Sequence, residues 1–120
     1  MSFAEELEAL CREVSGCQAA LVMSLDGISV ARHVSQDGSV DVETLLVELA
    51  GPLRMSLQAL SRVDGGDLQE LILGTAKGAL LIRWLKDEYF VALFLAVDGL
   101  MGKARFALRR HGPTLIKELS

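Results

Sequence analysis

The sequence predicts one α+β domain, in which three helices cover the two faces of a five-stranded antiparallel sheet. The first indication is that residues 68–97 contain three short apolar runs rich in residues that suit strands, at 71–73, 79–82 and 90–97. The breaks between these runs are short enough to be hairpin loops, so they predict a three-stranded meander. The runs are nearly continuous instead of alternating, which is typical of strands covered on both faces. The rest of the chain must therefore supply a cover for each face.

Length and composition agree with a single domain over residues 1–120. The chain is 51% hydrophobic and 23% charged, which is typical of a globular protein and not of a disordered one. This apolar share is high for a small domain, so some of it is expected to be buried against another chain. A net charge of −4 argues against nucleic-acid binding. The start of the chain lacks the pattern of a secretory signal, and no apolar run approaches a membrane span, so a cytoplasmic protein is expected.

The N-terminal third predicts a helix followed by a hairpin. Residues 3–14 place apolar side chains on one helical face, with Ser2 and Glu5 as a capping box and Gly16 ending the helix. Residues 19–24 and 28–33 are the strands of a hairpin that turns at Asp26-Gly27, and residues 35–39 form a polar loop. Cys11 falls on the apolar face and is interpreted as a small core residue in a reducing compartment. No further Cys or His lies near Cys11 and Cys17, so a zinc site has little support.

Two further helices complete the predicted order α-β-β-α-β-β-β-α. Residues 41–63 carry a leucine stripe that keeps its phase across Pro52, so one kinked helix capped by Asp41 is expected instead of two helices. Residues 64–67 form the loop into the meander. The last helix follows Val97, with Asp98 as its expected N-cap and a kink or short break at Gly112-Pro113. The first and last helices are expected on one face of the sheet and the middle helix on the other.

This order of elements, together with three local stretches, resembles the Roadblock family of dynein-light-chain-like domains over about residues 3–119. The stretches are residues 20–27 in the first hairpin, 78–82 in the fourth strand and 102–105 in the last helix. The resemblance implies a profilin-like sandwich that forms a homodimer through edge-to-edge pairing of the third strands, with the two middle helices side by side. An unpaired apolar edge favours such pairing. The residues expected at this dimer edge are Leu68, Glu70, Leu71, Ile72 and Leu73.

The resemblance also implies a regulator or scaffold of a Ras-like small GTPase, and stand-alone prokaryotic members of this size look most like the MglB type. The face of the middle helix opposite the leucine stripe is small and partly apolar, unlike an ordinary solvated face. We interpret it as the platform for the GTPase; the alternative is that it packs only on the sister helix. Its residues are Thr44, Val47, Gly51, Arg54, Met55, Gln58 and Arg62.

No catalytic site of the chain's own is predicted. Arg54 and Arg62 are candidates for arginine fingers supplied to a partner, although solvated helix arginines are the stronger interpretation. His33 and His111 are expected at the surface or a sheet edge. The chain lacks a phosphate-binding glycine loop and a nucleophile elbow, and no cofactor or metal is expected. A pure adaptor without effect on nucleotide turnover is the alternative function. A small-ligand sensor is disfavoured, because the strands are crowded with large aliphatic side chains.

Overall fold

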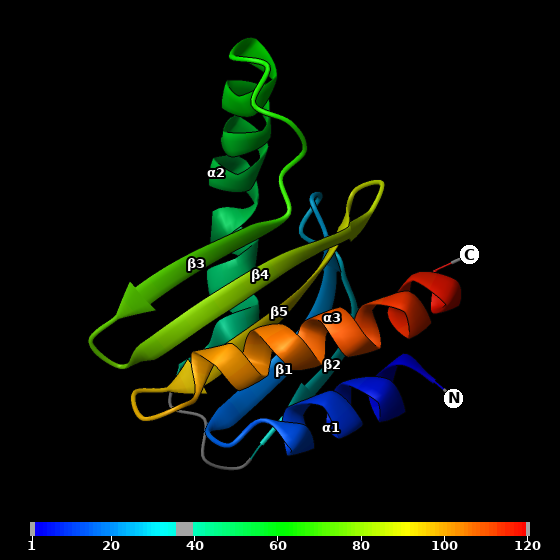
Figure 1. Ribbon diagram of the computed structural model, residues 1–120, viewed down its shortest axis with the longest axis vertical. Coiled ribbons are helices and arrows are strands. Elements are labelled where there is room, and N and C mark those ends of the chain that lie inside the picture. The colour runs from blue at the N-terminus through cyan, green and yellow to red at the C-terminus, as the bar shows by residue number, and fades with distance from the viewer. Residues whose placement is uncertain (1, 36–39, 120) are drawn as a thin grey trace.

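The structure, a computed structural model, describes residues 2–35 and 40–119 and has the predicted order of elements (Figure 1). The predicted polar loop over 35–39 lies, from residue 36 onward, outside the described residues. The elements are α1 (Phe3–Glu13), β1 (Cys17–Ser24), β2 (Ser29–Val34), α2 (Val42–Arg62), β3 (Glu70–Thr75), β4 (Gly78–Lys86), β5 (Tyr89–Ala96) and α3 (Met101–Glu118).

The five strands form one antiparallel sheet in the order β2-β1-β5-β4-β3. The predicted meander of β3, β4 and β5 is confirmed, and β5 is the central strand. Every residue from Phe90 to Leu95 is at most 1% exposed, as expected for a continuous apolar strand with a cover on each face. The strand at each edge of the sheet, β2 or β3, has only one neighbour, so each edge leaves a row of backbone groups unpaired within the chain.

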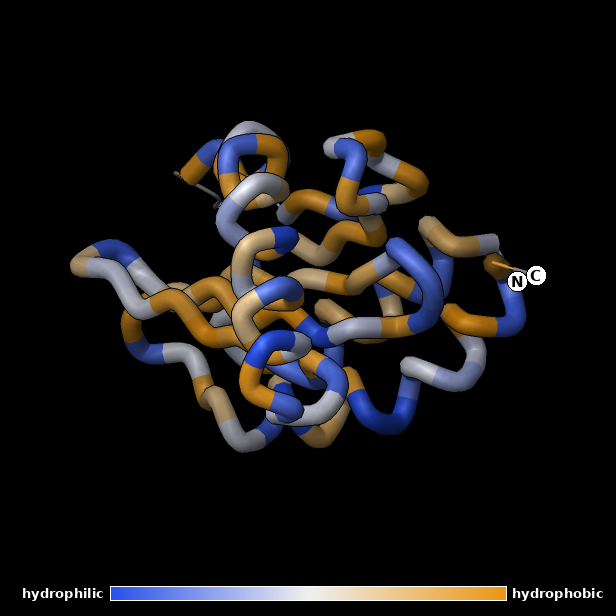
Figure 2. The backbone as a smooth tube through the Cα atoms, turned by 90° about the horizontal axis from the view of Figure 1, so that it is seen from above, coloured by the Kyte–Doolittle hydropathy of each residue, from blue (hydrophilic) through white to orange (hydrophobic). Residues whose placement is uncertain are grey.

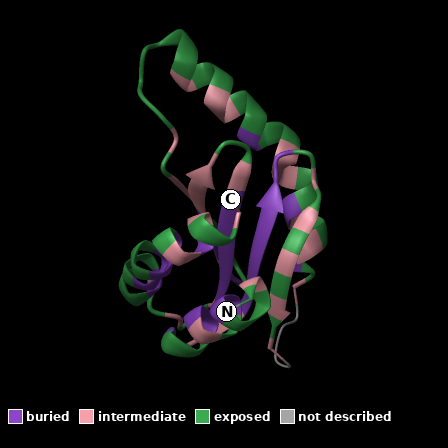
Figure 3. Cartoon of the chain, turned by 90° about the vertical axis from the view of Figure 1, so that its right-hand side faces the viewer, coloured by how far each residue is buried: buried purple, intermediate pink, exposed green. Residues whose placement is uncertain are grey.

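Two separate apolar cores sandwich the sheet, and the predicted distribution of the helices is confirmed. Leu7 and Leu10 of α1 pack with Leu108 of α3 on one face. Leu46 and Leu53 of α2 pack on the other face. β1, β5 and the first half of β4 carry long hydrophobic stretches and are deeply buried, whereas the edge strands β2 and β3 and most of α2 are exposed or half-buried (Figures 2 and 3). The N- and C-terminal ends of the chain lie at the same side of the α1/α3 layer (Figure 1).

Local contacts explain where the helices begin. The Ser2–Glu5 capping box and the Asp41 cap of α2 are both confirmed. The prediction of Asp98 as the cap of α3 is wrong, because the N-cap is Leu100 and makes no side-chain hydrogen bond. The chain first makes a turn, in which the Gly99 N–H donates to the Ala96 carbonyl at 2.8 Å. A Cβ on Gly16, whose φ is +87°, would lie 2.8 Å from the Gly99 Cα, so the two loops can only meet through glycine.

The long α2 is a single helix that continues through Pro52, as predicted. Ser56 Oγ donates to the Pro52 carbonyl at 2.9 Å. The C-terminal half of the helix extends past β3, beyond the edge of the sheet (Figure 1). Leu57 and Leu60 in this half are therefore only partly buried, although they belong to the same stripe as the fully buried Leu53. α3 is likewise unbroken at Gly112-Pro113.

Cys11 is a core residue, as predicted, but a disulfide joins it to Cys17 of β1, which disagrees with the expected reducing context. Cys11 is still buried, with 6% of its surface exposed. The turn between α1 and β1 brings the two Cα atoms to 5.4 Å, within the range that a disulfide needs. The spacing of the two cysteines, with five residues between them, did not predict this pairing.

Among the helices of the described residues, none combines the length and the apolar character that crossing a membrane requires.

Candidate partner-binding surface

The outer face of α2 is the surface formed by Thr44, Val47, Gly51, Arg54, Met55, Gln58 and Arg62. All seven residues are exposed, and they lie opposite the buried Val42, Leu46 and Leu53. The structure therefore brings together, on one helix, every residue that the sequence assigned to the platform. The same helical periodicity that buries the leucine stripe turns these side chains away from the sheet.

This outer face has exposed apolar side chains on either side of a glycine, from which no side chain projects. Val47 is 45% exposed and Met55 is 67% exposed. Between them lies Gly51, where an added Cβ would meet nothing within 4 Å. A glycine in the interior of an exposed helix lowers its stability, so a close backbone approach by another chain is a physical reason for its presence. The outer face thus combines exposed apolar side chains with open space at its centre.

One flank of the outer face is fixed to the turns at the strand ends. Arg54 reaches both turns, with Nη2 at 3.3 Å from Asp26 Oδ1 and Nη1 at 3.9 Å from Glu88 Oε1. Gly27 also lies beside Val47, since a Cβ on Gly27 would be 3.7 Å from the valine Cγ1. The Arg54 guanidinium thus already has two carboxylate neighbours, which favours a structural role over an arginine finger.

The first turn of α2 is held by its cap. Asp41 accepts hydrogen bonds from the Thr44 hydroxyl at 2.8 Å and from the Thr44 backbone N–H at 3.1 Å. These bonds to the Thr44 side chain and backbone hold the pKa of the Asp41 carboxyl below its ordinary value. Thr44 is therefore exposed on the outer face but already uses its hydroxyl within the chain.

β3 is an edge strand, which the sequence alone could not establish. The strand begins at Glu70, so Leu68, predicted at its start, instead lies in the preceding segment and packs against the α2-side core. The register pairs Leu71 with Ile82 and Leu73 with Leu80, which places these two leucines on the α2 side. Ile72 pairs with Leu81 and faces the α1/α3 side, where it is 46% exposed.

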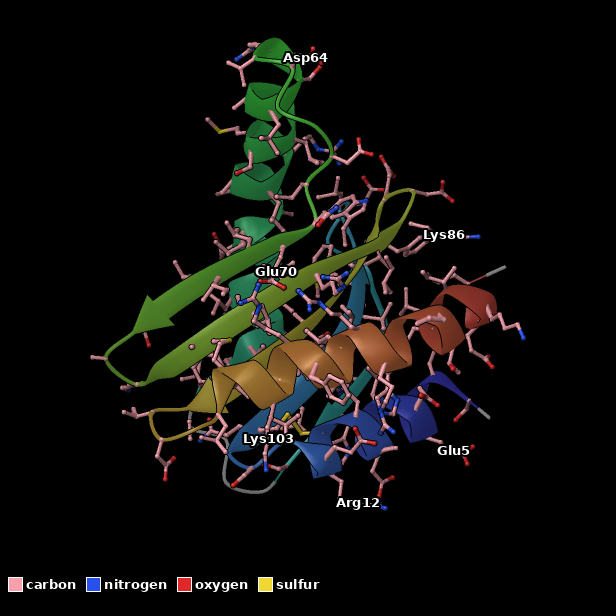
Figure 4. All side chains as sticks on the ribbon, in the orientation of Figure 1. Glu5, Arg12, Asp64, Glu70, Lys86 and Lys103 are labelled. Carbon is pink, nitrogen blue, oxygen red and sulfur yellow. A yellow bond between two sulfur atoms is a disulfide. The ribbon has the colours of Figure 1, made fainter. Side chains whose placement is uncertain are left out.

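Glu70 is the first residue of this edge strand, and its carboxylate is largely shielded from water. Its side chain is only 15% exposed and lies between two guanidinium groups (Figure 4). Arg105 Nε of α3 is 2.9 Å from Glu70 Oε1, and Arg83 Nη1 of β4 is 3.7 Å from Glu70 Oε2. The ion pairs anchor the edge strand to the helix layer, a role that the sequence prediction missed because these residues lie far apart in the chain.

His111 is buried between α1 and α3, so its expected surface location is wrong. Its Nδ1 contacts the buried carboxylate of Glu6, and its Nε2 lies 3.2 Å from Glu13 Oε1. The two carboxylates approach opposite ring nitrogens and do not converge on one point. Within residues 2–35 and 40–119, no group of His, Cys, Asp and Glu side chains is arranged to hold a metal ion. The cluster instead joins the first helix to the last.

Two hollows on the described surface are small. One beside Arg32 and Glu43 has a volume of about 120 Å³, and one beside Leu57 and Leu60 has about 270 Å³. Pockets for drug-sized ligands usually have ~300–1,000 Å³. The geometry therefore favours a protein-binding surface over a small-ligand site.

No family model and no curated protein matches the sequence, whereas solved structures do match. Among solved structures, MglC from Myxococcus xanthus is 32% identical, with a TM-score of 0.74, and the match covers 98% of this chain and 99% of MglC. The gliding protein MglB from Thermus thermophilus has a TM-score of 0.81 at 22% identity, over 95% of this chain and 85% of MglB.

The fold itself is shared more widely. A Roadblock/LC7 domain from Streptomyces avermitilis superposes with a TM-score of 0.85 at 15% identity, covering 99% of this chain and 98% of that domain. Profilin IB of Acanthamoeba castellanii has the same architecture, with a TM-score of 0.64 at 14% identity. The predicted profilin-like sandwich is thereby confirmed. The element order, the sheet topology and the relatedness to MglC over nearly the whole length lead to one conclusion: the chain belongs to the Roadblock family.

Proposed function

We propose that the chain forms a twofold homodimer in which two β3 edges pair and the two α2 helices lie side by side. The observation that supports it is the overhang of α2 beyond β3, on the same side as the open edge. Leu57 and Leu60 lie in this overhanging half of α2 and are only partly buried, and a second copy's β3 would extend the sheet toward them. Pairing would also cover the exposed edge, and twofold dimers are the commonest oligomers.

We further propose that the outer face of α2, doubled by the dimer, binds a Ras-like small GTPase in the cytoplasm. The exposed Val47 and Met55 around the flat Gly51 support this docking surface. The family resemblance supplies the class of partner. The dimer regulates or scaffolds the GTPase, and GTPase activation of the MglB type is the specific mechanism to test. The chain contributes a binding surface and no catalytic site of its own.

Two substitutions separate a docking platform from a dimer contact. Val47→Glu and Gly51→Lys place charge on the outer face, while Gly51→Ala adds a methyl group without charge and so separates the effect of charge from that of size. Light scattering measures the oligomeric state, and a binding assay measures retention of the GTPase. Loss of GTPase binding with an intact dimer supports the platform. Loss of the dimer instead means that these residues pack on the sister helix, and the proposed docking site is then wrong.

The dependence on nucleotide separates the regulator from the adaptor. The chain, immobilised as bait, is exposed to host lysate with GDP or with a non-hydrolysable GTP analogue. Retention of a small GTPase only with the analogue supports a regulator, and a hydrolysis assay with the purified partner follows. Recovery of other proteins to the same extent with GDP and with the GTP analogue favours a pure adaptor.

Arg54→Ala and Arg62→Ala test the arginine-finger hypothesis in that hydrolysis assay. We expect both variants to retain stimulated hydrolysis, because Arg54 is engaged with Asp26 and Glu88. Loss of an arginine finger usually lowers the rate by ~10³-fold or more. A decrease of that size in either variant, with GTPase binding retained, would identify a finger.

A further inference from the structure

The solvent-facing side of α3 is a concentrated positive surface on an acidic protein. The helix carries five Lys and Arg residues and only one carboxylate, Glu118, whereas the whole chain has a net charge of −4. Its buried side is packed on the sheet through Ala104, Leu108 and Leu115. The residues directed away from the sheet form what we term the basic face of α3, namely Lys103, Phe106, Arg109, Arg110 and Lys117.

An exposed aromatic ring lies within this basic face. Phe106 is 67% exposed. Lys103 precedes it by three residues, and Arg109 and Arg110 follow it by three and four, so all three cations are its neighbours on the helix surface. Aromatic rings and arginines are both enriched at protein–protein interfaces, so a large exposed ring among these cations is a candidate contact site.

Most of this charge is not used within the chain. Arg110 contacts Glu13 but remains 56% exposed. In the described part of the chain, no carboxylate forms an ion pair with Lys103, Arg109 or Lys117. Lys103 projects from the first turns of α3 (Figure 4). Like charges on neighbouring turns repel each other, so an anionic partner would relieve this repulsion.

We propose that the basic face of α3 binds a narrow acidic segment of a partner protein, which covers Phe106 with an apolar side chain. Charge complementarity supplies the attraction, and the ring supplies a desolvated centre. α3 covers the sheet face opposite α2, so this surface is distinct from the proposed GTPase platform. The chain could therefore hold both partners at once.

The neighbouring helix argues against an anionic membrane as the occupant. α1 lies beside α3 in the same layer and exposes Glu5 and Glu8. A flat anionic surface that touched α3 would also face these carboxylates, whereas a single segment can follow α3 alone. Membrane-surface helices also need a free apolar side, and that of α3 is already buried on the sheet.

The test uses defined probes and the full chain. The main probe is a fluorescent helical peptide of the same length as α3, 18 residues, with a leucine stripe flanked by Glu. Its counterpart has Lys in place of every Glu. Vesicles containing phosphatidylserine and single-stranded oligodeoxythymidine represent the two other anionic classes. Anisotropy measures affinity, and amide NMR shifts locate the binding site.

We expect the Glu peptide to bind and to shift the NMR signals of α3 amides. Its affinity should fall as salt is added. Lys103→Glu with Arg109→Glu should reduce its affinity about tenfold or more, and Phe106→Ala should reduce it by about threefold or more. Arg12→Glu with Lys77→Glu, which causes the same change in net charge elsewhere, should leave the affinity within about twofold. The variant residues are exposed, and circular dichroism verifies their folding.

Four outcomes would overturn the proposal. They are no binding of the Glu peptide, equal binding of the Lys peptide, equal loss in the Arg12/Lys77 control, and binding of vesicles or oligonucleotide in preference to the peptide. None of these outcomes bears on α2, so the proposed GTPase platform is tested separately. Conversely, failure of the GTPase experiments leaves this surface unaffected.

Discussion

Arg105 of α3 and Glu70 of β3 lie 2.9 Å apart, between Nε and Oε1, although they are distant in the sequence. The contact ties the edge strand that is proposed to pair with a second copy to the helix that carries the basic face. Because Arg83 also approaches Glu70, the carboxylate is largely withdrawn from water. The proposed dimer edge on β3 and the basic face of α3 are therefore held by the same group of ion pairs.

Glu70→Gln should destabilise the fold by about 1–2 kcal/mol, since a partly buried carboxylate with two cationic neighbours loses its charge. It should also weaken the dimer, because the start of β3 is no longer fixed. Urea unfolding and light scattering measure the two effects. The control is Asp98→Asn, an exposed carboxylate whose loss should change little. An unchanged midpoint for Glu70→Gln would show that the anchor contributes nothing.

Gly51→Ala should stabilise the protein by about 1 kcal/mol, the usual advantage of alanine over glycine in a helix interior. The structure leaves room for the methyl group, since nothing lies within 4 Å of it. Thermal unfolding at low protein concentration provides the measurement. A loss of stability would contradict an open outer face and would indicate that another chain packs directly on Gly51.

His111→Ala should cost about 3 kcal/mol or more, because it leaves the buried Glu6 carboxylate without its partner. His33→Ala, at a half-buried position of the edge strand β2, should cost clearly less. A double-mutant cycle with Glu6→Gln, followed by urea unfolding, isolates the pairwise coupling. Additive effects in that cycle would mean that the two side chains do not interact.

The Asp41 cap should make stability fall in acid. Its pKa is lower in the folded state than in the unfolded chain, so its contribution is fully present above the ordinary value of 3.8 and is lost as the pH falls through the folded pKa. Asp41→Asn keeps a capping oxygen but cannot titrate, so its unfolding midpoint should depend less on pH below about 4. Identical acid profiles for the two proteins would contradict the assignment.

Local patterns were sufficient to predict most of the fold. Capping residues such as Ser2 and Asp41 mark helix starts in the sequence itself, and the phase of the leucine stripe shows that α2 continues through Pro52. The outer face of α2 follows from the same periodicity. These features depend on residues within one or two turns of each other, where propensity and spacing carry the information.

Features that depend on distant residues could not be predicted. The burial of His111 results from Glu6, which is 105 residues away, and the anchoring of Glu70 results from Arg83 and Arg105. The position of β3 at the edge depends on strand order, which no local pattern encodes. The Asp98 prediction failed because the close contact between Gly16 and Gly99 keeps the chain in a turn.

The packing of α1 on α3 also affects how the chain reaches its fold. Contacts such as Arg110 with Glu13 join residues 97 positions apart and raise the contact order, which across small proteins correlates with slower folding. Because both chain ends lie at the same side of that layer, they could be joined by a short linker and new ends opened in the exposed turn at Ala76-Lys77. Such a circular permutant would make α3 and α1 consecutive in sequence and convert these long-range contacts into local ones, while the sequences of β1, β5 and α2 stay unchanged.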